Sequence, residues 1–99
     1  NSQTLIQFGF HEWHVFRKGV QNMAPENQGV YAFRSRAPIQ LRMGSSDITY
    51  IGRAMSKEKG QHHNIRHSIN EYLHPGHDQR TKIRVGRIAL EEKWEVSWL

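Results

Sequence analysis

A chain of 99 residues is long enough for one domain with a modest core, and the lack of cysteine excludes both a disulfide scaffold and a cysteine-ligated zinc site. Fourteen Lys and Arg residues against nine Asp and Glu residues give a net charge of +5 with histidine neutral, which favours a polyanionic partner, nucleic acid first. The apolar runs are too short to span a membrane and no signal-peptide pattern opens the chain, so we expect an intracellular protein, in the cytoplasm or nucleoid.

The first 28 residues are predicted to form an N-terminal extension and a loop. Residues 4–16 are rich in aromatic side chains but follow neither the helical nor the strand period. We expect the larger apolar side chains of this segment to cover one edge of the core, namely Leu5, Phe8, Trp13, Val15 and Phe16. Residues 18–29 contain many turn-forming residues and therefore predict a loop.

Two strands are predicted after this loop. Residues 29–34 alternate in a way that places Tyr31 and Phe33 on one face of a strand. Residues 35–47 contain a proline and a glycine and predict a long connection, and residues 48–54 predict a second strand. Two strands joined in this way form most simply an antiparallel pair.

A helix is predicted beyond a charged, glycine-containing loop at residues 56–63. Asn64 is a suitable N-cap, because its side-chain oxygen can accept a hydrogen bond from a free backbone N–H of the first turn. The apolar residues that follow recur at helical spacing, at Ile65, Ile69, Tyr72 and Leu73. The sequence His-Pro-Gly at 74–76 is expected to end this helix.

The last third of the chain predicts a second helix and a third strand. Residues 81–93 place apolar side chains on one helical face, although residues 83–85 also suit a strand. Residues 94–98 alternate strictly and predict a strand. We therefore expect one α+β domain over residues 1–99, in which a small three-stranded, mainly antiparallel sheet is covered by helices in the order β-β-α-α-β and residues 29–99 form the core.

Two tripeptides stand inside the first two predicted strands, GVY at 29–31 and YIG at 50–52, and an arginine-bearing helix follows them. This pattern resembles the GIY-YIG nuclease superfamily, and the resemblance extends from about Pro25 to Leu99. It implies a GIY-YIG-like endonuclease domain that binds duplex DNA and hydrolyses its phosphodiester bonds with a divalent ion, Mg²⁺ or Mn²⁺.

The resemblance implies roles for both tripeptides. Tyr31 would serve as general base or as a relay to water, and Tyr50 would position the phosphate. A phenol with an ordinary pKa of about 10 can do the former only where cations or a metal favour its phenolate form. Gly52 would let the backbone approach the substrate or the next element closely. Arg53 would contact phosphate, with an exposed arginine at the sheet edge as the alternative.

The catalytic arginine of the family usually lies four residues before an aromatic residue or histidine on the first helix. Tyr72 is the natural aromatic residue here, but Ser68 stands four residues before it. The nearest arginine is Arg66, which lies on the other side of the apolar stripe and is the catalytic candidate; its alternative is a solvated cation on the helix surface.

Further cations and histidines near the second tripeptide are candidates for nucleic-acid binding: Lys57, Lys59, His63 and His67. His63 and His67 are four residues apart on the predicted helix, a spacing that can also bind zinc. A small histidine-rich metal-binding protein is therefore an alternative.

The metal-binding glutamate of the family belongs to a helix after the third strand. Glu91 and Glu92 come before the predicted third strand and Glu95 lies within it, so the expected glutamate lies beyond Leu99 and the chain is expected to be a fragment. If it is not, a second hypothesis is a catalytically degenerate module of the same fold that binds nucleic acid without cutting it.

Overall fold

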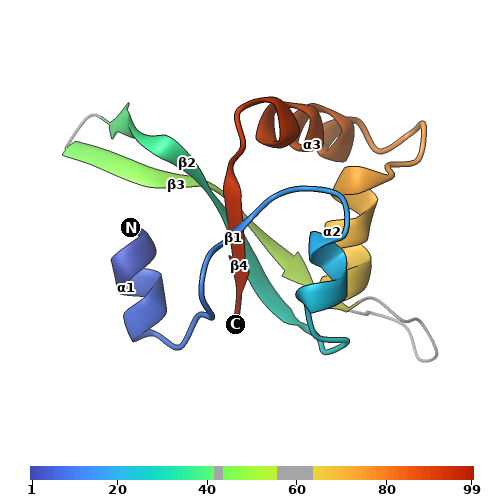
Figure 1. The fold of residues 1–99 in the computed structure, drawn as a ribbon, viewed down its shortest axis with the longest axis horizontal. Helices are drawn as coiled ribbons and strands as arrows, with labels where there is room; N and C mark the ends of the chain where they lie inside the picture. The colour runs from blue at the N-terminus through green and yellow to red at the C-terminus, as the bar shows by residue number, and fades with distance from the viewer. Residues whose placement is uncertain (42–43, 56–63) are drawn as a thin grey trace.

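The computed structural model describes residues 1–41, 44–55 and 64–99 and shows an α+β fold with an antiparallel sheet and helices (Figure 1). The elements in chain order are α1 (Ser2–Gln7), β1 (His14–Val15), the 3-10 helix η1 (Val20–Met23), β2 (Gly29–Leu41), β3 (Gly44–Ala54), α2 (Ile65–Leu73), α3 (Arg80–Glu91) and β4 (Glu95–Trp98). The predicted α+β class is therefore confirmed.

The described residues form a sheet of four strands in the order β1-β4-β2-β3, and every neighbouring pair is antiparallel. The strand that carries GVY, β2, is central, because it pairs with β3 on one side and with β4 on the other. Tyr31 lies opposite Gly52 of β3 and opposite Trp98 of β4. Because paired residues share a face of the sheet, this register fixes which side chains meet the helices.

The prediction of three strands in the order β-β-α-α-β is wrong for the whole chain. That order describes residues 29–99, but α1, β1 and η1 precede them, and β1 adds a fourth strand by pairing His14 with Val96. A strand of two residues is too short to show a period in the sequence. Its partner lies more than eighty positions away, so local pattern could not indicate the pairing.

The predicted connection over residues 35–47 is also wrong, because β2 and β3 continue through most of it as a long hairpin. Pro38 indicated a break, since proline cannot donate to a strand ladder. The pairing register shifts between Arg34 and Ile39, so Pro38 lies where the ladder is irregular. The irregular register lets the hairpin tolerate a proline.

The N-terminal apolar residues only partly cover the core as predicted. Phe16 is buried, but the side chain of Phe8 is 74% exposed and Val15 is exposed as well. Phe10, which the pattern did not single out, is buried instead. The aromatic composition of this segment indicated burial correctly, but without a regular period it did not indicate which residues are buried.

Helix α2 forms as its sequence predicts. Asn64 caps it, and its side-chain oxygen accepts a hydrogen bond from the backbone N–H of His67 at 2.7 Å. The predicted apolar stripe is buried against the sheet and η1: Ile65, Ile69, Tyr72 and Leu73. Helix α3 confirms the helical prediction over the strand alternative for residues 83–85.

Helices α2 and α3 approach each other closely at one glycine. A Cβ atom on Gly86 would lie 2.2 Å from the backbone carbonyl oxygen of Tyr72, so only glycine fits at this contact. The contact sets the position of the whole of α3 relative to α2, including Lys82, one turn before Gly86.

The sheet face opposite α2 carries a polar network that holds α1 in place. The backbone N–H and hydroxyl of Ser2 both donate to the carboxylate of Asp47. The guanidinium of Arg34 donates to the Ser2 hydroxyl at 3.0 Å and forms an ion pair with Glu95 at 2.8 Å. The same guanidinium lies 4.6 Å from the ring centroid of Trp13. These contacts join α1, β2, β3, β4 and Trp13, the residue before β1, into one unit. Within the described parts of the chain, no helix is long and apolar enough to cross a membrane.

Candidate nucleic-acid site

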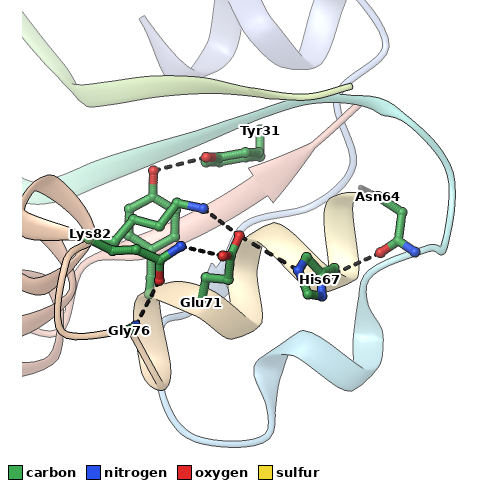
Figure 2. A network of polar contacts seen from close by, with 8 residues as sticks. Tyr31, Asn64, His67, Glu71, Gly76 and Lys82 are labelled. Carbon is green, nitrogen blue, oxygen red and sulfur yellow. Dashed lines mark hydrogen bonds and ion pairs between the residues drawn. The ribbon is translucent and has the colours of Figure 1, made fainter. Parts of the chain in front are cut away.

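Three tyrosines from three elements meet between the sheet and α2, and we call them the tyrosine cluster: Tyr31, Tyr50 and Tyr72. The hydroxyl oxygens of Tyr31 and Tyr72 lie 2.9 Å apart and share a hydrogen bond (Figure 2). The ring centroids of Tyr50 and Tyr72 are 6.2 Å apart with tilted planes, an arrangement that aromatic pairs prefer. The structure thus brings the tyrosines of both tripeptides together, with a third from the helix that follows.

The register of the β2–β3 pair explains this convergence. Tyr31 lies opposite Gly52, and Phe33 lies opposite Tyr50, so all four residues share the face that α2 covers. A Cβ atom on Gly52 would come within 2.4 Å of the Tyr31 ring and hydroxyl. Gly52 was predicted to permit a close approach by substrate or by the next element. The group that approaches it in the structure is the Tyr31 ring.

The three side chains of the tyrosine cluster differ in their exposure to solvent. Tyr31 and Tyr72 are 3% and 2% exposed, whereas Tyr50 is partly exposed at the edge of the cluster. Burial raises the pKa of Tyr31 to about 12, although the hydrogen bond from Tyr72 favours its ionised form. Burial also raises the pKa of Tyr72 far above its ordinary value, and the hydroxyls of Tyr31 and Tyr50 act in the same direction. Both buried phenols are therefore protonated at neutral pH, and Tyr50 is the member that a ligand can reach.

The raised pKa of Tyr31 predicts a loss of stability at high pH. Below pH 10 both the folded and the unfolded chain keep this proton; between pH 10 and about 12 the unfolded chain loses it first, so stability falls as pH rises. A pKa difference of about two between the folded and the unfolded chain corresponds to a loss of at most about 2.7 kcal/mol in the free energy of unfolding. We expect urea unfolding across this window to show a steeper decline for the wild type than for the Tyr31→Phe/Tyr72→Phe variant. Parallel declines would contradict this linkage.

A charged pair lies beside the tyrosine cluster, between α2 and α3. The Lys82 ammonium donates to the Glu71 carboxylate at 2.6 Å and lies 5.4 Å from the ring centroid of Tyr72 (Figure 2). Gln79 also donates to Glu71, and His67 approaches it at 3.9 Å. Burial opposes ionisation of Glu71, but the hydrogen bonds from Lys82 and Gln79 hold its pKa below the usual range. The sequence did not indicate this pair, because its members lie eleven positions apart on different helices.

Arg66 lies on a different side of α2 from the tyrosine cluster, and its guanidinium is bonded to residues 22–26, at the end of η1 and just after it. It donates to the backbone carbonyl of Ala24 at 2.9 Å and forms an ion pair with Glu26 at 2.8 Å. It also donates to the backbone carbonyl of Asn22 at 3.4 Å. Among the described residues, the groups bonded to Arg66 all belong to residues 22–26. The structure therefore does not bring Arg66 to Tyr31 and Tyr50.

Ser68 occupies the helix position where the resemblance expects an arginine. Its side chain is 4% exposed, on the same buried side of α2 as Tyr72. A serine this deeply buried brings no positive charge to the tyrosine cluster. Lys82 of α3 is the cation that the described structure places against the cluster instead.

Two of the remaining predicted contacts, Arg53 and His67, are exposed. Arg53 is exposed and lies opposite Val30, on the face of the sheet that does not carry Tyr31. His67 is exposed on α2 near Glu71. Lys57, Lys59 and His63 lie outside the described residues. Gly52 is beneath the Tyr31 ring, as stated above.

The described residues contain no group of three or more His, Asp or Glu side chains placed to hold a metal ion. Glu95 is paired with Arg34, and Glu91 and Glu92 lie at the exposed end of α3.

Comparison of the chain with protein-family models, with curated proteins and with solved structures finds no match in any of the three.

Proposed function

We propose that this chain is a GIY-YIG-like endonuclease domain that binds duplex DNA inside the cell and hydrolyses a phosphodiester bond. The observation that supports this proposal is the convergence of Tyr31 from GVY, Tyr50 from YIG and Tyr72 from the following helix. The register of β2 and β3 places the tyrosines of both tripeptides on the face that α2 covers, which is an arrangement that the resemblance leads us to expect.

The exposures of the tyrosines divide the roles among them. Tyr50 is reachable and would donate a hydrogen bond to a phosphate oxygen. Tyr31 is buried and protonated, so it would act as a relay and as support for Tyr72 and not as a phenolate base. Neither Arg53, on the other face of the sheet, nor Arg66, bonded to residues 22–26, lies at the tyrosine cluster. Charge on the pentavalent phosphorus would be stabilised by Lys82, which lies 5.4 Å from the Tyr72 ring and would first have to release Glu71. Mg²⁺ or Mn²⁺ would supply further electrostatic stabilisation when bound.

Nicking of supercoiled plasmid tests this proposal. With Mg²⁺ or Mn²⁺ present, we expect the natural protein to convert the plasmid to open circles. We expect Tyr50→Phe to slow this by about 100-fold, the usual cost of removing one positioned hydrogen-bond donor, and Tyr31→Phe to slow it by about as much, the usual contribution of a proton relay. Affinity for a labelled duplex, measured by fluorescence anisotropy, should change little, because a single hydroxyl is removed. Wild-type nicking rates in both variants would contradict the roles of the two tyrosines.

A second candidate function is a module of the same fold that binds nucleic acid without cutting it. Two observations favour it: Ser68 is buried at the arginine position, and the guanidinium of Arg66 is bonded to residues 22–26. This candidate predicts salt-sensitive binding to duplex DNA and no cleavage product with either ion. A product that appears with the wild type and disappears with Tyr50→Phe would exclude it.

A further inference from the structure

Helix α3 carries three arginines on its outer surface, and we call them the α3 arginine stripe: Arg80, Arg84 and Arg87. All three are exposed. Their spacing of four and three residues places them within about 60° around the helix axis and along about 10 Å of its length. The buried residues of α3 lie on the opposite side: Val85, Gly86 and Ala89. The stripe therefore points away from the body of the protein.

Unlike Arg34, Arg66 and Lys82, the members of the stripe have no acidic partner within the described chain. Arg34 pairs with Glu95, Arg66 with Glu26, and Lys82 with Glu71. No described carboxylate forms an ion pair with a member of the stripe. Three guanidinium groups are thus presented to solvent side by side with their charge uncompensated.

This arrangement works against the stability of α3. Like charges four or three residues apart repel each other on a helix surface. The helix dipole favours anions in the first turn and cations in the last, but α3 has Arg80 in its first turn and Glu91 in its last. Within this helix the first turn holds no acidic residue and the last turn no basic one. Helix stability alone does not explain the stripe, whereas a polyanionic ligand would remove the repulsion.

We propose that the α3 arginine stripe binds the phosphate backbone of duplex DNA. Duplex DNA carries one negative charge for about every 1.7 Å of its axis, so a row of three arginines about 10 Å long faces several phosphates. Guanidinium groups suit this partner because their planar donors bind phosphate in pairs. Lys82, on the opposite side of α3, faces the tyrosine cluster, so the stripe is a separate contact that anchors the duplex. The proposal rests on the proposed function only for the identity of the ligand as DNA.

The test compares two double variants that each remove two exposed charges, Arg84→Gln/Arg87→Gln on the stripe and Arg17→Gln/Lys18→Gln in the loop before η1. Binding to a labelled 20-bp duplex is measured by anisotropy from 50 to 200 mM salt. Each lost phosphate contact reduces the magnitude of the slope of log K against log salt by about 0.9, so the slope of the stripe variant should be smaller by about 1.8. Its affinity at low salt should fall by at least 10-fold. The loop variant should change the slope by less than about 0.5.

Two further measurements separate the outcomes. Thermal unfolding of the stripe variant should show an unchanged or raised midpoint, since repulsion within α3 is relieved. The Arg84→Lys/Arg87→Lys variant keeps both charges, so the slope of log K against log salt should be that of the wild type. An unchanged slope in the stripe variant overturns the stripe proposal even if the wild type nicks plasmid. If the salt slope of the stripe variant is reduced and the wild type does not nick plasmid, the result supports the stripe proposal and contradicts the endonuclease proposal.

Discussion

Gly86→Ala is expected to lower the free energy of unfolding by about 4 kcal/mol, the largest effect that we predict for one methyl group in this chain. The new Cβ would lie 2.2 Å from the Tyr72 carbonyl oxygen, which belongs to the backbone of a packed helix and cannot rotate away. Helix α3 would have to move away from α2, and Lys82 would lose its place beside Glu71 and the Tyr72 ring. Urea unfolding followed by circular dichroism measures the loss.

Gly76→Ala is the matched control for this substitution. Gly76 is exposed, and the nearest atom to its added Cβ would be a carboxylate oxygen of Asp78 at 3.2 Å, at the end of a movable side chain. We expect this variant to stay within about 0.5 kcal/mol of the wild type. Equal stabilities for Gly86→Ala and Gly76→Ala would show that α2 and α3 are not as close as described.

Gly52→Ala is expected to lower the free energy of unfolding by about 3 kcal/mol, because the added methyl group would clash with one side chain, that of Tyr31. The added Cβ would meet the Tyr31 ring at 2.4 Å, and the ring cannot retreat because Phe33 and Tyr72 pack against it. Displacing the ring would also break the hydrogen bond between the Tyr31 and Tyr72 hydroxyls. We therefore expect the variant to lose both stability and the raised pKa of Tyr31.

A double-mutant cycle isolates this contact. In a Tyr31→Ala background the ring is absent, so Gly52→Ala should be nearly neutral or even favourable, since alanine restricts the unfolded chain more than glycine does. The coupling between the two positions should reach about 2 to 3 kcal/mol, at the upper end of the usual range for residues in contact. A coupling near zero would mean that Gly52 is required for a reason other than the Tyr31 ring.

The sequence was sufficient to predict the elements that signal themselves locally. Helix α2 has a capping Asn64 and an apolar stripe of the right period, and both are present in the structure. The antiparallel pairing of the strands that carry GVY and YIG was also predicted correctly. In each case the deciding interactions are between residues close in the chain or between two adjacent strands.

Features that depend on distant segments were not predictable. Strand β1 has only two residues, and it exists because β4 offers it an edge. The extension of β2 past Pro38 depends on an irregular register that no local pattern encodes. The sequence carries no signal for pairing of this kind, because the energy comes from contacts that form only in the folded chain.

The candidate site was predictable to a similar degree. The resemblance assigned Tyr31 and Tyr50 to one site, and the structure brings them into one cluster and adds Tyr72 to them. The relation of Arg66 to residues 22–26 was not foreseeable, since it depends on how the loop after η1 folds back on α2. The roles of these residues in binding or cleavage remain predictions.

The position of β4 between β1 and β2 has a consequence for how the protein is made. Residues 95–98 are synthesised after the three other described strands of this sheet, yet they pair with His14 on one side and with Tyr31 on the other. Until they leave the ribosome, β2 has one open edge and the nascent chain exposes the apolar surface that Val96 and Trp98 later cover. Folding of the sheet is therefore completed only after translation of its last strand, and the β2–β3 hairpin with α2 is the part able to form first.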